Sequence, residues 1–207
     1  MNPRPSRYQL GLVVSLVVLL VWSGLHPHDR FTWFLEVFPI LIGVPVLIAM
    51  RPRFRFTRLV YTLVWVHAGI LILGGHYTYA KVPLGFWMED WFGFHRNHYD
   101  RIGHLAQGFI PAIIAREVFI RRSPLRGTRW VPFMTVCFCL AFSAFYELIE
   151  FWTALGTGGA ATDFLGTQGD PWDTQWDMML ALIGSIVAVL LLSRWHDRAI
   201  ARVESEG

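Results

Sequence analysis

Residues 10–25 read LGLVVSLVVLLVWSGL, an apolar run without a charged side chain. A helix of about 20 apolar residues crosses the ~30 Å hydrocarbon layer of a membrane. Arg4 and Arg7 precede the run, and the polar segment HPHDR at 26–30 follows it without the small residues of a signal-peptide cleavage site. The run therefore predicts a membrane span that stays in the protein, rather than a cleaved leader.

Further apolar runs follow along the 207-residue chain. With 54% hydrophobic residues, 16% charged residues and a mean hydropathy of +0.42, the composition excludes a disordered chain, a disulfide scaffold and an ordinary soluble enzyme. We expect an all-α membrane protein with six transmembrane helices in one polytopic domain, residues 1–207. The predicted spans are residues 10–25, 31–50, 59–75, 102–120, 131–152 and 176–192.

Basic residues are divided unevenly between the two ends of these spans. Fourteen of the 18 Lys and Arg residues lie in the N-terminal segment, in the connections near 51–58 and 116–129, and in the C-terminal tail. Because cytoplasmic loops carry an excess of Lys and Arg, both termini are predicted to be cytoplasmic. The two longer connections, 76–101 and 153–175, then lie on the outer face. The net charge of +3 is the remainder of this asymmetry, so we expect a lipid bilayer as partner and no nucleic acid.

Polar side chains gather at the outer ends of three predicted spans. At 100° per residue, each group falls on one face of its helix. An ionisable residue inside a span costs about 2.5–3.5 kcal/mol at the helix centre, and is a functional-site hypothesis by default. The three stripes lie at similar depth and predict one outward-facing site. Their main members are Asp100, His104 and Gln107, then Glu147 and Glu150, then Asp173 and Asp177.

Histidine and carboxylates at i,i+3 and i,i+4 spacing are the ligands that a divalent metal needs inside a helix bundle. Imidazole with carboxylates suits zinc, manganese or iron, whereas a mostly carboxylate set suits calcium or magnesium. The predicted metal ligands are Asp100, His104, Glu147, Glu150, Asp173 and Asp177, and all of these except Asp173 are also candidate catalytic residues. The candidate substrate-binding residues are Arg101, Gln107, Gln168, Asp170 and Trp172.

Three functions remain open on this pattern. The first is a metal-assisted hydrolase or transferase that acts on a lipid or cell-envelope precursor. The second is a proton- or cation-coupled transporter, which needs a polar path toward the cytoplasm; the inner halves of the spans supply little beyond Thr135 and the boundary pair of Arg116 and Glu117. The third is a non-catalytic scaffold, in which His104→Ala and Glu147→Ala lose stability or partners while metal binding and turnover are unaffected. No hydrolase elbow, His-Glu-x-x-His pair, Walker loop or dinucleotide fingerprint is present.

Several segments together resemble the signature of the YjdF-like predicted inner-membrane proteins. They are YDRIGHLAQGF at 99–109, ARE at 115–117, YELIE at 146–150 and QGDPWDTQWDM at 168–178. That family has no known function, so the resemblance implies an inner-membrane location and a role on the envelope side, without a reaction. At the level of pattern, Asp-x-x-x-His followed by late Glu and Asp residues is similar to the VanZ-like superfamily, which is linked to glycopeptide resistance. The Gly-rich outer loop with Asp163 and Asp170 departs from that pattern.

Overall fold

The computed structural model describes residues 6–157, 165 and 167–206, and these contain helices but no strand. Asp163 lies outside the described residues. The prediction of an all-α protein is confirmed for the described part of the chain. The long elements are α1 (Arg7–Leu25), α2 (Arg30–Met50), α3 (Arg58–Tyr77), α4 (Pro83–Phe92), α5 (Tyr99–Arg122), α6 (Trp130–Thr157) and α8 (Asp173–Ser205), with a short 3₁₀ helix η1 (Tyr79–Lys81) before α4.

Five of these helices, α1, α2, α3, α6 and α8, are long and apolar enough to cross a membrane. The fourth predicted span, 102–120, lies within α5, which has Asp100 in its first turn and Arg121 and Arg122 in its last. Helix α5 is not among the five helices that meet this criterion, so the count of six spans stays a prediction. The connection 76–101, predicted as a loop on the outer face, contains η1 and α4.

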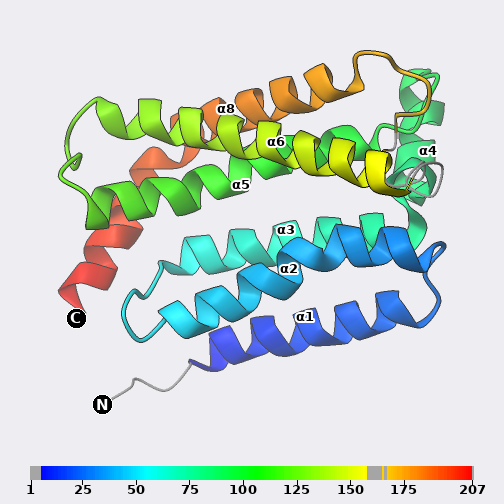
Figure 1. Ribbon diagram of the computed structural model, residues 1–207. Helices are drawn as coiled ribbons and strands as arrows, with labels where there is room; N and C mark the ends of the chain where they lie inside the picture. Colours follow the sequence, from blue (N-terminus) through cyan, green and yellow to red (C-terminus); the bar gives the residue numbers. More distant parts are fainter. Residues whose placement is uncertain (1–5, 158–164, 166, 207) are drawn as a thin grey trace. The chain divides into compact units, whose positions relative to one another are not determined.

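The described chain forms two compact units. The first unit comprises Met1–Arg55, Val64–Asp100 and Thr153–Gly169. In it, α1, α2 and α3 run side by side (Figure 1). Indole N–H groups link these helices, since Trp33 Nε1 of α2 donates to Ser23 Oγ at 3.0 Å and Trp65 Nε1 of α3 donates to Ser15 Oγ at 2.9 Å. Its buried core consists of Leu16, Val37, Ile40, Ala68 and Ile72.

The second unit comprises Phe56–Leu63, Arg101–Trp152 and Asp170–Gly207, and its long helices are α5, α6 and α8. At two glycines, the backbones of helices α5 and α8 pack directly against each other. A Cβ atom at Gly108 would overlap the carbonyl of Ala181, and one at Gly184 would overlap the carbonyl of Leu105. Small residues at such crossings let helices pack closely inside a membrane. This contact fixes the positions of the polar residues at the start of both helices.

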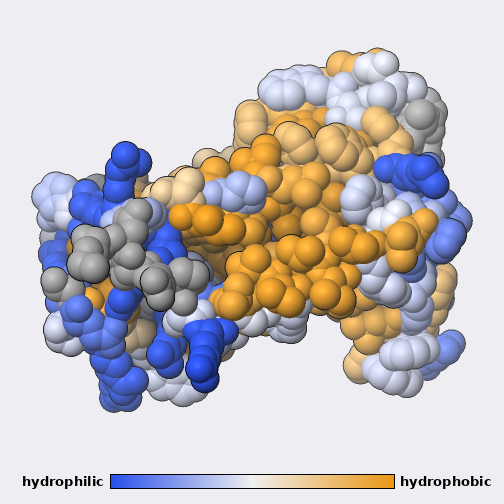
Figure 2. Space-filling view, turned by 90° about the horizontal axis from the view of Figure 1, so that it is seen from below, coloured by the Kyte–Doolittle hydropathy of each residue, from blue (hydrophilic) through white to orange (hydrophobic). Residues whose placement is uncertain are grey.

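Large apolar side chains point outward on the helices. Val18 of α1 is 62% exposed and Leu190 of α8 is 75% exposed. Figure 2 shows a broad hydrophobic surface between two hydrophilic ends. Because a soluble protein rarely exposes an apolar surface of this extent, the surface is the face that such a chain presents to lipid.

Asp29 caps the start of α2, where its Oδ1 accepts the backbone N–H of Thr32 at 2.7 Å. This hydrogen bond lowers the pKa of Asp29 from its usual 3.8, so the ionised cap is the favoured form. We expect Asp29→Ala to lower the free energy of unfolding by about 1 kcal/mol at pH 7, measured by thermal unfolding in detergent.

The Asp29→Asn variant serves as the control, since asparagine is an equally good helix cap. A lowered pKa in the folded state gives stability that is present above the unfolded pKa of 3.8 and is lost as the pH falls through the lowered value. The gap between wild type and Asp29→Ala should therefore narrow in strong acid. An undiminished gap there would contradict an ionised cap.

Candidate metal centre

The candidate site lies at the end of the second unit where α5 and α8 begin. His104 is on the second turn of α5, Glu147 and Glu150 are near the end of α6, and Asp177 is on the second turn of α8. Antiparallel packing of α6 against the other two helices brings these ends together (Figure 1). The polar stripes predicted on these three helices therefore come together at these four residues.

His104, Glu147 and Glu150 each offer one ligand atom, and these atoms all lie within 4.8 Å of one another. The His104 Nδ1 atom is 3.8 Å from Glu147 Oε1, and its Nε2 atom is 3.8 Å from Asp177 Oδ1. His104, Glu147 and Asp177 are all buried, with exposed fractions of 6%, 7% and 2%. Both separations are too long for hydrogen bonds. The ring thus lies between two buried carboxylates. The 3.8 Å between each ring nitrogen and its carboxylate oxygen is also a distance found between two ligand atoms of one metal ion.

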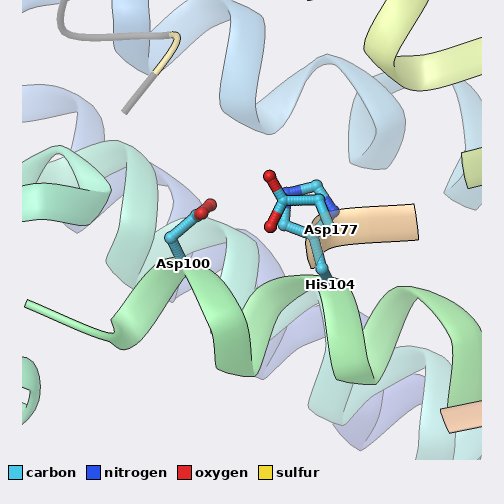
Figure 3. Close-up of side chains that lie close together, drawn as sticks. All are labelled: Asp100, His104 and Asp177. Carbon is cyan, nitrogen blue, oxygen red and sulfur yellow. The ribbon is translucent and has the colours of Figure 1, made fainter. Parts of the chain in front are cut away.

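Asp100 and Gln107 belong to the same helix as His104, one turn before it and one turn after it. Figure 3 shows Asp100 and His104 rising from this helix, with Asp177 beside the imidazole ring. Asp100 and Gln107 are both 8% exposed. The three side chains recur at the helical period and all are buried, so they lie on one buried face of α5.

Arg101 lies among three aspartates of the second unit. Its Nη1 atom donates to Asp177 Oδ1, and its Nη2 atom donates to Asp173 Oδ1 at 2.7 Å and to Asp170 Oδ2 at 3.2 Å. The Asp170 carboxylate also accepts the backbone N–H of Trp172 at 2.9 Å, which shapes the turn before α8. Arg101, predicted to bind a substrate, is thus paired with Asp173 and Asp177, which were predicted as metal ligands.

The remaining predicted residues, Gln168 and Trp172, lie elsewhere. Gln168, in the first unit, pairs with the backbone of Asn97: its Oε1 accepts the Asn97 N–H at 3.1 Å, and its Nε2 donates to the Asn97 carbonyl at 2.9 Å. Trp172 is 64% exposed at the N-cap of α8. Gln168 therefore joins the two long connections 76–101 and 153–175, and it is not part of the His104 cluster.

A second buried polar network lies near the other ends of α5 and α8. Glu117 and His196 have side chains with no exposed surface. Glu117 accepts from the Thr57 hydroxyl at 2.8 Å, from Arg121 Nη1 at 2.6 Å and from His196 Nε2 at 3.0 Å. Sequence reasoning placed Glu117 at the membrane boundary and gave His196 no role, so this network was missed.

The network also sets the tautomer of His196. Arg116 Nη1 lies 3.2 Å from His196 Nδ1, and an arginine nitrogen can only donate. Nδ1 is therefore the acceptor, and Nε2 carries the proton that His196 donates to Glu117. Arg116 also donates to Asp197 Oδ1 at 2.7 Å. One signal was present in the sequence: Glu117 and Arg121 have i,i+4 spacing, which favours an ion pair.

Comparisons with known proteins agree with the membrane character of the chain. The family model described as "Predicted membrane protein (DUF2238)" matches residues 8–198. The inner membrane protein YjdF of Escherichia coli (strain K12) is 49% identical over 189 residues, which cover 91% of this chain and 90% of the relative. No solved structure matches. The family resemblance seen in the sequence motifs is confirmed.

Proposed function

We propose that this chain, which belongs to the DUF2238 family of predicted membrane proteins, binds a divalent metal ion at His104, Glu147 and Glu150. The metal would serve a hydrolase or transferase that acts on a lipid or cell-envelope precursor. The observation that carries this proposal is the cluster itself: one imidazole nitrogen and two carboxylate oxygens within 4.8 Å of one another in a mostly apolar molecule. Buried ionisable groups are costly unless they are paired or coordinate a metal.

The donor set fits a transition metal better than calcium. A nitrogen ligand with carboxylate oxygens suits zinc, manganese or iron, whereas calcium takes six to eight oxygen atoms. With metal–ligand bonds of about 2.1 Å, two ligand atoms of one metal lie roughly 3–4 Å apart. The 3.8 Å between His104 Nδ1 and Glu147 Oε1 is within that range. Asp100, one turn before His104 on α5, is a candidate for a further ligand or a general base.

Such a metal would activate a water molecule and polarise the bond under attack, which is how metal ions assist hydrolysis and group transfer. Within this scheme, Glu147 and Glu150 hold the ion from α6 and His104 holds it from α5. Gln107 lies next along α5 and would orient one of these groups by hydrogen bonding. A lipid-linked substrate is supported by the position of the cluster, near the helix ends of a chain whose outer surface is apolar.

Metal analysis tests the proposal. Protein purified in detergent and stripped of metal should take up one equivalent of zinc or manganese, and His104→Ala and Glu147→Gln should lose stoichiometric binding. Asp90→Asn is a matched control, because Asp90 is an exposed carboxylate on α4 outside the cluster. The loaded protein is then incubated with vesicles of bacterial lipid extract, and products are identified by mass spectrometry. If the well-folded wild-type protein binds no metal, the proposal is wrong.

A cation- or proton-coupled transporter is the second candidate, and one observation favours it. Helix α6 buries Thr135, Cys139, Ser143 and Glu147 at every fourth position, so a row of polar atoms extends from the candidate site into the unit. The Glu117–His196 network lies farther along α5, 13 residues or roughly 20 Å from His104. Proton flux into proteoliposomes that Ser143→Ala abolishes, with metal binding unchanged, would favour transport over hydrolysis.

The six-span topology and both cytoplasmic termini remain part of the proposal, as does an inner-membrane location. The arginine asymmetry of the sequence supports the topology, and the similarity to YjdF, an inner membrane protein, supports the location. A reporter enzyme that is active only outside the cytoplasm should be inactive when fused after Ser205 and active when fused within 93–98. An active C-terminal fusion would exclude this topology.

A further inference from the structure

The two nitrogen atoms of His104 face different carboxylates. Nδ1 faces Glu147 and Nε2 faces Asp177, each at 3.8 Å. A neutral imidazole has one nitrogen with a lone pair, which binds a metal, and one N–H, which donates a hydrogen bond. In metal sites, the N–H usually points to a carboxylate or a carbonyl, which fixes the tautomer and the ring orientation. The ring of His104 must therefore bind a metal on one side only.

On the Asp177 side of the imidazole ring, the Arg101 guanidinium already supplies a positive charge. Arg101 Nη1 donates to Asp177 Oδ1, the same oxygen that faces His104 Nε2. A divalent ion bound to that oxygen would lie within about 4 Å of the guanidinium nitrogen, where two positive charges repel strongly. Arg101 also contacts Asp173 at 2.7 Å, so the guanidinium is held in place from a second side. On the Nδ1 side the ring faces Glu147, and Glu150 offers a carboxylate oxygen within 4.8 Å of a Glu147 oxygen.

We propose, building on the metal proposed above, that Asp177 is a positioning residue rather than a ligand. It accepts the Nε2–H of His104, and Arg101 holds the Asp177 carboxylate for that purpose. Nδ1 of His104 then binds the metal together with Glu147 and Glu150. The His104–Asp177 separation of 3.8 Å has to shorten by about 0.9 Å for this hydrogen bond to form, with the metal bound or absent.

This assignment gives the acidic residues two separate roles. Glu147 and Glu150 bind the ion, whereas Asp173 and Asp177 compensate the charge of Arg101 and set the tautomer of His104. It therefore differs from the sequence-based ligand set, which includes Asp173 and Asp177. The difference is testable because losing a ligand and losing an orienting partner change metal binding to different extents.

The first experiment titrates cobalt(II) into the metal-stripped full-length protein in detergent. We expect Glu147→Gln to lose stoichiometric binding, and Asp177→Asn to keep one equivalent with a Kd raised about 10–100-fold. The double variant Arg101→Gln with Asp177→Asn keeps the local charge balanced and should behave like Asp177→Asn; it covers the case in which the single variant fails to fold. Retained binding in Glu147→Gln with complete loss in the folded double variant would overturn the assignment.

The second experiment needs no metal, so it separates this inference from the metal proposal. Protein labelled with ¹⁵N-histidine is compared by NMR with His104→Gln, which identifies the His104 signals. We expect the Nε2–H tautomer in wild type and a mixture of tautomers in Asp177→Asn. If wild type binds no metal, the metal proposal fails, and the tautomer still decides the role of Asp177. A Nδ1–H tautomer, or a spectrum that Asp177→Asn leaves unchanged, would overturn the inference.

Discussion

Glu117→Ala is expected to lower the free energy of unfolding by about 3–5 kcal/mol, because removing one partner leaves buried charges without compensation. The Glu117 carboxylate accepts from Arg121, His196 and Thr57, and its side chain has no exposed surface. Alanine would leave the Arg121 guanidinium and the His196 N–H facing a cavity. The measurement is SDS-driven unfolding in mixed micelles, followed by tryptophan fluorescence.

Glu204→Ala is the matched control for this variant. Glu204 also pairs with an arginine, Arg126, at 2.8 Å, but that pair is on the surface, with the Arg126 side chain 58% exposed. Surface pairs contribute little to stability, so the unfolding midpoint should hardly move. Glu117→Gln tests the charge separately, since the amide oxygen still accepts hydrogen bonds while Arg121 loses its counter-ion. Equal effects of Glu117→Ala and Glu204→Ala would show that burial of the network contributes nothing.

Gly108→Ala is expected to be the other strongly destabilising change, at roughly 1–3 kcal/mol or more. A methyl group at this position overlaps the backbone carbonyl of Ala181, which no side-chain rotation can move away. Helices α5 and α8 would have to separate, and the distance between His104 and Asp177 would change with them. Metal binding should therefore weaken together with stability. The measurements are SDS-driven unfolding and a cobalt titration on the same preparation.

Gly69→Ala, in the interior of α3, is the control for the Gly108 variant. A Cβ atom there has no heavy atom within 4 Å, so the space is open. Because alanine favours helix over glycine by about 0.5–1 kcal/mol, this change should leave the protein unaffected or slightly more stable. Destabilisation of similar size at both glycines would show that the loss at Gly108 does not come from the α5–α8 contact.

Most helices of this protein could be predicted because each corresponds to one local pattern in the sequence. The apolar run 10–25 is long enough to span a bilayer, and it forms α1 within Arg7–Leu25. The polar stripes were equally visible, since Asp100 and His104 repeat at the helical period and share one buried face of α5. The helical period shows which residues share a face. Three helix faces with acidic or histidine side chains, in a chain that is otherwise apolar, can be buried together in only a few ways.

Contacts between distant residues could not be predicted in the same way. His196 lies 79 residues from Glu117, and nothing in either local sequence selects the other as its partner. Arg101 was assigned to a substrate because a basic residue beside a carboxylate site suits an anion, yet three aspartates from one later segment contact it. Helix α4 was missed because it is short, although Pro83 at its first turn and Gly93 with a φ of +68° at its end are ordinary boundary signals.

The pairing of α5 with α8 has a consequence for how the chain is assembled in the membrane. Arg101 and Glu117 of α5 meet Asp177 and His196 of α8, which are synthesised 76 and 79 residues later. As α5 leaves the ribosome, its charges have no counter-ions from α8, and charged helices partition poorly into lipid. Helices α1 to α3 carry enough apolar sequence to insert one by one. On the proposed six-span topology, we expect stable insertion of α5 to require α8, so that a later helix completes the insertion of an earlier one.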